Sequence, residues 1–148
     1  MFKMGIGSTG EEIIQAAKDL GLTPDEFSQC NTERAREIVQ EAQDTFVIGN
    51  PRAWWMSLKH PFESFDYPLG RGFDKILNHV PPGVQRCWLI PETEEKDLPV
   101  FDVNVGYVSR LLGQCSYFEY YLVGKTFDWV LIENDHNQII VSRVFRKA

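Results

Sequence analysis

The feature that most constrains the fold is a long apolar stretch between Tyr117 and Phe145. It reads YFEYYLVGKTFDWVLIENDHNQIIVSRVF. Aromatic and β-branched residues, which favour strands, fill three runs. Residues that favour turns separate these runs, around Gly124 and again between Asn134 and Asn137. The stretch therefore predicts three consecutive β-strands joined by two tight turns.

The first turn sets a register for the first two strands. Gly124 suits the first central position of a two-residue hairpin turn, which would pair Leu122 with Phe127. Because side chains alternate between the faces of a strand, one face becomes strongly apolar. We expect this face to be the core face, and it holds Phe118, Tyr120, Leu122, Phe127, Trp129, Leu131, Ile140 and Val144.

The second turn sets the register of the third strand. If Glu133 pairs with Gln138, then Asp128 lies opposite Arg143. The other face of the sheet is then mixed, apolar at one end and charged and phenolic at the other. Its polar end holds Tyr117, Glu119, Tyr121, Asp128 and Arg143.

Helical signals dominate the first part of the chain. Ser8 or Thr9, followed by Glu11 or Glu12, predicts a capped first helix. Thr23-Pro24-Asp25-Glu26 predicts the start of a short second helix, because proline suits the first position of a helix. A third helix is expected from about Thr32. We therefore expect residues 1–44 to be a helical segment.

Short mixed elements are expected between this segment and the three-strand block. In order they are a β-like run at 45–48, a helix at 52–59, an aromatic loop at 60–69, a helix at 73–80, strands at 84–90 and 98–101, and a helix capped by Asp102 or Asn104. Helices first and hairpins last predict a single α+β domain over residues 1–148. Its antiparallel sheet would hold one or two strands besides the C-terminal three, with helices packed on one face, and residues 45–148 would form the mixed part.

Charge and composition limit the classes of partner. The formal net charge is −6, and residues 1–44 alone carry −5. This acidity disfavours nucleic acid and anionic membranes as partners and favours a basic or polar-aromatic one. No signal-peptide core or membrane-length apolar run is evident, so we expect a cytoplasmic protein. Three widely spaced cysteines match neither a disulfide framework nor a metal-ligand set.

One group of side chains suggests catalysis. In the predicted register, Glu119, Asp128, Tyr121 and Arg143 share the polar end of the second sheet face. Two carboxylates beside a tyrosine and an arginine suit general acid–base work in a small-ligand-binding protein or hydrolase, with the 60–69 loop over the pocket. The alternative is that Arg143 forms a structural cross-strand ion pair with the acids. No histidine or cysteine joins the group as a nucleophile.

A second group lies in the hairpin turn after Glu133. Asp135 and His136 could ligate a metal with Glu133, but the spacing fits neither a structural zinc site nor a calcium loop. A hydrogen-bonded turn is the alternative. The sequence therefore predicts no metal and no cofactor.

The third helix offers an acidic surface. Glu33, Glu37 and Glu41 lie on its polar face, which is either a docking surface or an ordinary solvated face.

Several blocks of sequence resemble an uncharacterised family of small bacterial proteins. They are Trp54-Trp55-x-x-Leu58-Lys59, Gly72–Val80, Trp88-Leu89-Ile90-Pro91, Phe118–Val123, Phe127-Asp128-Trp129 and Glu133-Asn134-Asp135-His136. The resemblance covers about residues 50–145. The family is in turn loosely similar to immunity proteins of toxin–immunity and contact-dependent inhibition systems, which are small acidic cytoplasmic α+β proteins that bind a toxin. Family members often carry two adjacent histidines at the hairpin turn, and Asp135 here replaces the first, which weakens the case for a metal or catalytic turn.

We therefore expect a non-catalytic protein-binding domain, an immunity protein that covers the active site of a basic toxin domain. It would act as a monomer or homodimer. A structural or regulatory domain without chemistry, including a homodimer through the second sheet face, is a further alternative. The predicted partner-binding residues are Glu33, Glu37, Glu41, Tyr117, Glu119, Tyr121, Asp128, Asp135 and His136.

Overall fold

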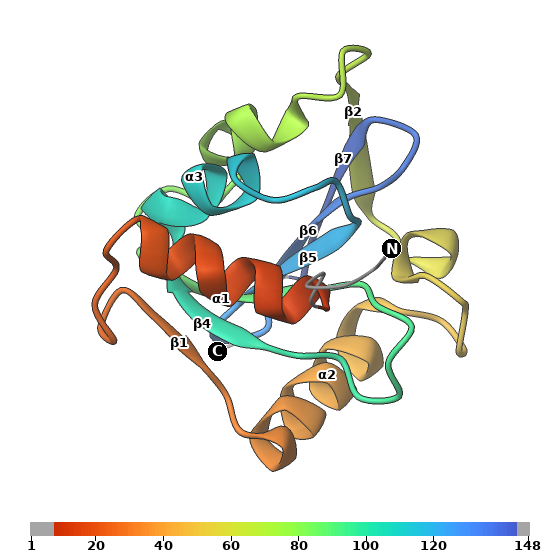
Figure 1. The fold of residues 1–148 in the computed structure, drawn as a ribbon. Helices are drawn as coiled ribbons and strands as arrows, with labels where there is room; N and C mark the ends of the chain where they lie inside the picture. The colour runs from red at the N-terminus through yellow and green to blue at the C-terminus, as the bar shows by residue number, and fades with distance from the viewer. Residues whose placement is uncertain (1–7, 145–148) are drawn as a thin grey trace.

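The computed structural model describes residues 8–144, so the predicted strand end at Phe145 lies outside the described residues. These residues form one seven-stranded sheet in which every neighbouring pair is antiparallel, with the order β1-β4-β3-β5-β6-β7-β2 (Figure 1). The strands are β1 Phe27–Gln29, β2 Phe62–Asp66, β3 Arg86–Pro91, β4 Phe101–Asn104, β5 Tyr120–Gly124, β6 Trp129–Glu133 and β7 Gln138–Arg143. The α+β class and the C-terminal three-strand block are confirmed.

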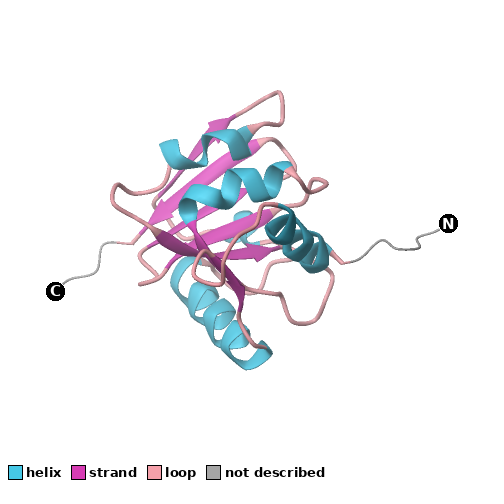
Figure 2. Cartoon of the chain, turned by 60° about the vertical axis from the view of Figure 1, so that its left-hand side comes forward, coloured by secondary structure: helices cyan, strands magenta, loops and turns pink. Residues whose placement is uncertain are grey.

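Helices cover both faces of the sheet, whereas the sequence suggested one. On one face lie α1 (Thr9–Asp19), α3 (Val108–Gly113) and the short 3₁₀ helices η2 (Gly72–Asn78) and η3 (Val105–Tyr107). On the other face lie α2 (Thr32–Phe46) and the 3₁₀ helix η1 (Trp54–Ser57). Figure 2 shows the sheet between these two layers. Within the described range, no helix combines the length and apolarity needed to cross a membrane.

The central strands explain why two layers are needed. Every residue of β5 and β6 is buried, so both sequences read as continuous apolar runs, which is typical of strands covered on both sides. Tyr120, Leu122 and Leu131 pack toward α1 and α3. Tyr121 and Val130 alternate with them and pack toward α2. Each face therefore has its own hydrophobic core.

The first half of the chain is only partly helical. Ser8 and Glu11 form the predicted capping box of α1. The segment after Thr23 makes a single turn, in which Glu26 and Phe27 donate backbone hydrogen bonds to the Thr23 carbonyl, and then enters β1 instead of a second helix. The third predicted helix is confirmed, and it runs on to Phe46. Of the β-like run expected at 45–48, the first two residues are therefore helical, whereas Val47 is extended and forms an antiparallel bridge with Leu58.

The strand β2 was missed by the sequence analysis, which gave 60–69 as a loop. Residues 62–66 pair with β7, with Phe62 opposite Ser142, and form one edge of the sheet. Phe65 packs on the α1 side, while Phe62 packs on the α2 side. Four strands, not one or two, therefore precede the C-terminal three.

The first hairpin differs from its predicted register by four residues. Leu122 lies opposite Leu131, not Phe127, because the connection is longer than a two-residue turn. Phe127 has a φ of 57°, and its N–H donates to the Gly124 carbonyl. A shift by an even number of residues keeps the paired strand residues on their faces, although Phe127 in the turn packs on the α2 side and not on the predicted face. The predicted core positions Tyr120, Leu122 and Leu131 are therefore correct despite the wrong pairing.

The second hairpin differs by one residue, which exchanges the faces of β7. Glu133 lies opposite Ile139, because Asn137 adopts a left-handed conformation with a φ of 59°. The α1-side core therefore receives Ile139 and Val141, and the predicted core residue Ile140 packs on the opposite face.

The same shift overturns the predicted pairing of Asp128 with Arg143. Arg143 lies opposite Trp129. Among the ion pairs of the described residues, none joins Arg143 to Asp128. Asp128 instead accepts a hydrogen bond from the Thr126 hydroxyl at 2.8 Å.

Asn134 holds the second hairpin in this register. Its side chain is 0% exposed. The Oδ1 atom accepts hydrogen bonds from the backbone N–H groups of His136 at 3.0 Å and Gln138 at 3.1 Å. The Nδ2 atom donates to the side chain of Gln138 at 3.0 Å. This single amide satisfies donors that the turn would otherwise leave buried without partners.

We expect Asn134→Ala to destabilise the protein by about 2–3 kcal/mol, because it leaves partly buried backbone donors without an acceptor. Urea unfolding followed by circular dichroism measures the change. Asn50→Ala, the same substitution at an exposed site without a side-chain hydrogen bond to the described residues, is the matched control and should stay within about 0.5 kcal/mol of wild type. Equal stabilities of the two variants would contradict the role given to Asn134.

Candidate functional site

Several predicted site residues gather beside the turn between β6 and β7. We call this surface the aromatic–acidic patch, and its members are Trp55, Tyr117, Glu119, Asp135 and His136. They come from three separate parts of the chain: η1, the segment before β5, and the turn itself. Hydrogen bonds, a ring contact and mutual electrostatic effects connect them.

Glu119 is the centre of the aromatic–acidic patch. Its Oε2 atom accepts a hydrogen bond from Trp55 Nε1 at 3.1 Å and another from the backbone N–H of Asp135 at 2.8 Å. One carboxylate oxygen therefore ties η1 to the hairpin turn. The backbone of Glu119 adds to this by accepting from the N–H of Glu92 at 2.9 Å.

The rings of the patch are presented to solvent in fixed positions. Trp55 and His136 meet edge to face, with ring centroids 5.2 Å apart. The side chain of His136 is 64% exposed and that of Asp135 is 61% exposed. Tyr117 is 55% exposed. Partial burial raises the pKa of Tyr117, and the nearby carboxylates of Glu133, Glu119 and Asp135 raise it further.

Tyr121 lies beneath the patch and not on it. It is completely buried, and its ring stacks on Trp54 with centroids 4.1 Å apart. Its hydroxyl donates to a carboxylate oxygen of Glu92 and accepts from the backbone N–H of Trp54 at 3.3 Å. The prediction that Tyr121 contacts a partner is therefore wrong, because the α2 layer covers this face. The adjacent tryptophans lie in different environments, with Trp54 buried and Trp55 partly exposed at the rim.

Two acids in this region favour the neutral form more than usual. Burial raises the pKa of Glu119, against the hydrogen bonds from Asp135 and Trp55 that lower it. Burial also raises the pKa of Glu92, against the hydrogen bond from Tyr121, and the charge of Glu119 adds to the rise. Glu92 is thus a half-buried partner of Tyr121.

The other predicted residues lie elsewhere. Glu33, Glu37 and Glu41 are exposed along α2. Glu37 is engaged by Arg34 at 3.1 Å, so that surface is of mixed charge. Asp128 is exposed in the β5–β6 turn, at the opposite end of β6 from the patch.

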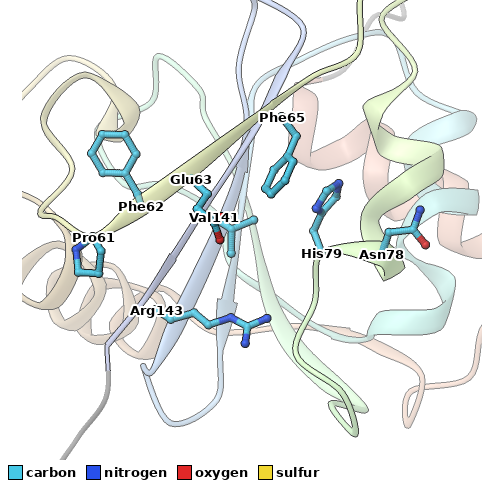
Figure 3. Close-up of a pocket in the computed structure, with 8 residues that line it drawn as sticks. All are labelled: Pro61, Phe62, Glu63, Phe65, Asn78, His79, Val141 and Arg143. Carbon is cyan, nitrogen blue, oxygen red and sulfur yellow. The ribbon is translucent and has the colours of Figure 1, made fainter.

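The proposed catalytic group is therefore not assembled. Of its four members, Arg143 alone lines the 440 Å³ cavity beside β2. Phe65 and His79 line this cavity as neighbours, with ring centroids 4.4 Å apart, and Figure 3 shows Arg143 below them in the view. The Nε2 atom of His79 lies 2.5 Å from the Tyr67 hydroxyl, and burial lowers its pKa. The 60–69 segment does border a cavity, but Glu119, Tyr121 and Asp128 do not reach it.

A smaller cavity of about 120 Å³ adjoins the aromatic–acidic patch. We call it the Glu133 pocket, after the acid in its wall, and Tyr117 belongs to both surfaces. Glu133 is only 2% exposed. The sequence analysis assigned it to the turn. Its position in phase with the core residues Trp129 and Leu131 was the signal that it points inward.

The described side chains do not match the geometry of a metal site. Within residues 8–144, no group of three or more histidine, cysteine or acidic side chains is placed to hold a metal ion. His136 and Asp135 approach each other at 3.5 Å, but the turn is closed by Asn134 and not by a ligand. What the aromatic–acidic patch offers is a preorganised surface of rings and acids.

In wild type, ionisation of Glu119 should lower the free energy of unfolding as the pH rises from 4 to 8. Glu119→Gln should make this decrease smaller. A carboxyl whose folded pKa is raised stabilises the fold below its unfolded pKa of about 4.3, and this contribution is lost as the pH rises through the folded value. Glutamine keeps the acceptor oxygen but does not ionise. Urea unfolding at several pH values between 4 and 8 should show wild type losing stability relative to the variant as the pH rises. A pH-independent difference would contradict a raised pKa for Glu119.

Comparison with known proteins places the chain in a family without assigning an activity. Searches of curated proteins and of solved structures returned no match. The model of one protein family, DUF6756, described as a family of unknown function, matches residues 9–147. The match includes α1 and α2, which lie outside the range where the sequence resemblance was expected. The chain therefore belongs to DUF6756, a family of unknown function.

Proposed function

We propose that this protein is a non-catalytic binding domain of the immunity type, which neutralises a basic toxin domain by docking over its active site. The observation that carries the proposal is the aromatic–acidic patch, where exposed rings and carboxylates are held in place by hydrogen bonds. The bacterial origin and cytoplasmic location expected from the sequence are part of the same proposal.

The composition of the patch suits a protein interface. Tryptophan and tyrosine supply most of the binding energy at many interfaces, and Trp55 and Tyr117 are the rings available here. Glu119 fixes Trp55 before any partner arrives, which lowers the entropy lost on binding.

The charges of the patch favour a basic partner. Glu119 and Asp135 lie on it, and Glu133 lies in the adjacent pocket, within a chain of net charge −6. Complementary charges speed association and orient the partner. A toxin that acts on nucleic acid carries a positively charged active site, and an acidic surface docked there would exclude its substrate.

Tyr117→Ala and Asp135→Lys should each weaken the complex. Truncating an interface ring typically costs about 1–2 kcal/mol or more, and about 1.4 kcal/mol corresponds to a tenfold change in affinity. The purified protein is titrated with the product of the adjacent gene, and both affinity and inhibition are measured. We expect at least a tenfold loss for each variant.

Glu41→Lys is the matched control for Asp135→Lys, because it reverses one exposed charge on α2 without touching the patch. It should change affinity by less than about threefold, mainly through the association rate. If the α2 variant weakens binding and the patch variants do not, the docking surface is α2. If no complex forms and toxin activities are unaffected by the protein, the proposed function is wrong.

A further inference from the structure

The Glu133 pocket is a small cavity with both apolar and polar walls. It lies between η2, the end of α3 and the segment before β5, and opens beside Tyr117. Phe73, Leu112 and Phe118 provide apolar walls, and Tyr117, Tyr120 and Glu133 provide the polar groups. At about 120 Å³ it is much smaller than the roughly 300–1,000 Å³ typical of small-molecule sites. Its size suits one amino-acid side chain.

The acid in this pocket is buried and has no ion-pair partner among the described residues. Glu133 is 2% exposed, and no lysine, arginine or histidine of residues 8–144 forms an ion pair with it. The nearby Arg71 lies over the ring of Phe73 and is paired with Asp74 at 2.6 Å. Buried carboxylates are normally paired, because desolvation without a partner is expensive.

Tyr120 supplies a second unpaired polar group. Its hydroxyl is buried and makes no hydrogen bond of normal geometry, although it lies close enough to Glu133 for the two groups to perturb each other. The two residues lie opposite each other on β5 and β6. The backbone of Gly72 packs closely against Glu133, since an added Cβ would lie 3.3 Å from Glu133 Oε2 and 3.0 Å from Ile139 Cγ1. A buried acid and a buried hydroxyl thus lie together at one small cavity, and the interaction with Tyr120 lowers the pKa of Glu133 against the larger effect of burial.

We propose that the Glu133 pocket binds the side chain of a lysine presented by the partner protein. The ammonium group would meet the carboxylate of Glu133 and the hydroxyls of Tyr120 and Tyr117, while the alkyl stem packs between Phe73 and Phe118. This inference rests on the proposed function for the identity of the partner. The chemistry of the pocket can be tested without it.

Lysine fits the pocket better than arginine. An ammonium group has three donors, and the carboxylate of Glu133 and the hydroxyls of Tyr117 and Tyr120 are acceptors in the pocket wall. A guanidinium has five donors in a planar fork and would leave some unpaired in so small a space. The aromatic walls add an attraction that acts on any cation close to a ring face.

The first experiment uses n-butylammonium, which reproduces the lysine side chain. It is titrated into ¹⁵N-labelled protein, and amide shifts are followed by NMR. We expect saturable shifts at residues around the pocket with a dissociation constant on the order of millimolar. Glu133→Gln should weaken the binding of n-butylammonium at least tenfold. The uncharged analogue n-butanol should bind more weakly, and its affinity should be the same for wild type and Glu133→Gln.

Asp135→Asn is the matched control, because it removes one negative charge from the patch outside the pocket and should leave n-butylammonium binding nearly unchanged. Gly72→Ala places a methyl group 3.3 Å from Glu133 Oε2, which crowds the carboxylate without changing its charge, and should also weaken binding. A bound cation favours the ionised form of Glu133, so the affinity should rise with pH and the carboxyl ¹³C titration should move to lower pH. The groups that face Glu133 and enter this titration are Tyr120, Tyr117 and Asp74.

The result that overturns the inference is binding that spreads over the acidic surface and does not depend on Glu133, or equal binding of butanol. A further arm compares N-acetyl-lysine methylamide with its arginine and side-chain-acetylated analogues, and lysine should bind best.

With a partner in hand, Glu133→Gln should weaken the complex while Asp135→Asn weakens it less. If Glu133→Gln leaves the complex unaffected, the lysine inference is wrong but the proposed function stands. If an amine binds at Glu133 and no partner complex forms, a free amine is the ligand and the proposed function is wrong.

Discussion

The structure depends on the burial of both faces of its central strands. Burying apolar surface contributes roughly 25 cal/mol per Å², and β3, β5 and β6 carry large apolar side chains in both directions. Such strands are stable only between two layers. The α2 layer is anchored on the sheet by the stacked pair of Trp54 and Tyr121. That anchor also places the neighbouring Trp55 at the rim, where the aromatic–acidic patch begins.

The fold class could be predicted because its signals are local. Alternation within 117–145 and the capping residues Ser8 and Asn31 act over a few positions, and the structure follows them. Register could not be predicted as well, because it depends on whether one turn residue adopts a positive φ. Phe127 and Asn137 both do so, but the first shifts the pairing by an even number of residues and the second by one. The first error is harmless and the second exchanges the faces of β7.

The candidate site was harder to predict than the fold. Tyr117, Glu119, Asp135 and His136 come together because Glu119 links a turn to η1, a contact that spans 64 residues of sequence. The role of Glu133 follows from tertiary packing, since an acid before a turn reads as solvated until η2 and α3 enclose it. Edge strand β2 was missed because its pairing partner is far away in sequence. These are long-range effects that a single sequence does not display.

The order of strands in the sheet has a consequence for how the chain reaches its folded state. Residues 62–66 pair with 138–143, near the end of the described chain, and form the outermost strand next to β7. During synthesis, which proceeds at about 5–20 residues per second, β2 must wait several seconds for its partner strand. Until then its apolar residues Phe62 and Phe65 remain uncovered. Translation of the C-terminal hairpin is thus the event that completes the sheet, and a chain stopped before it would leave β2 free to pair with other molecules.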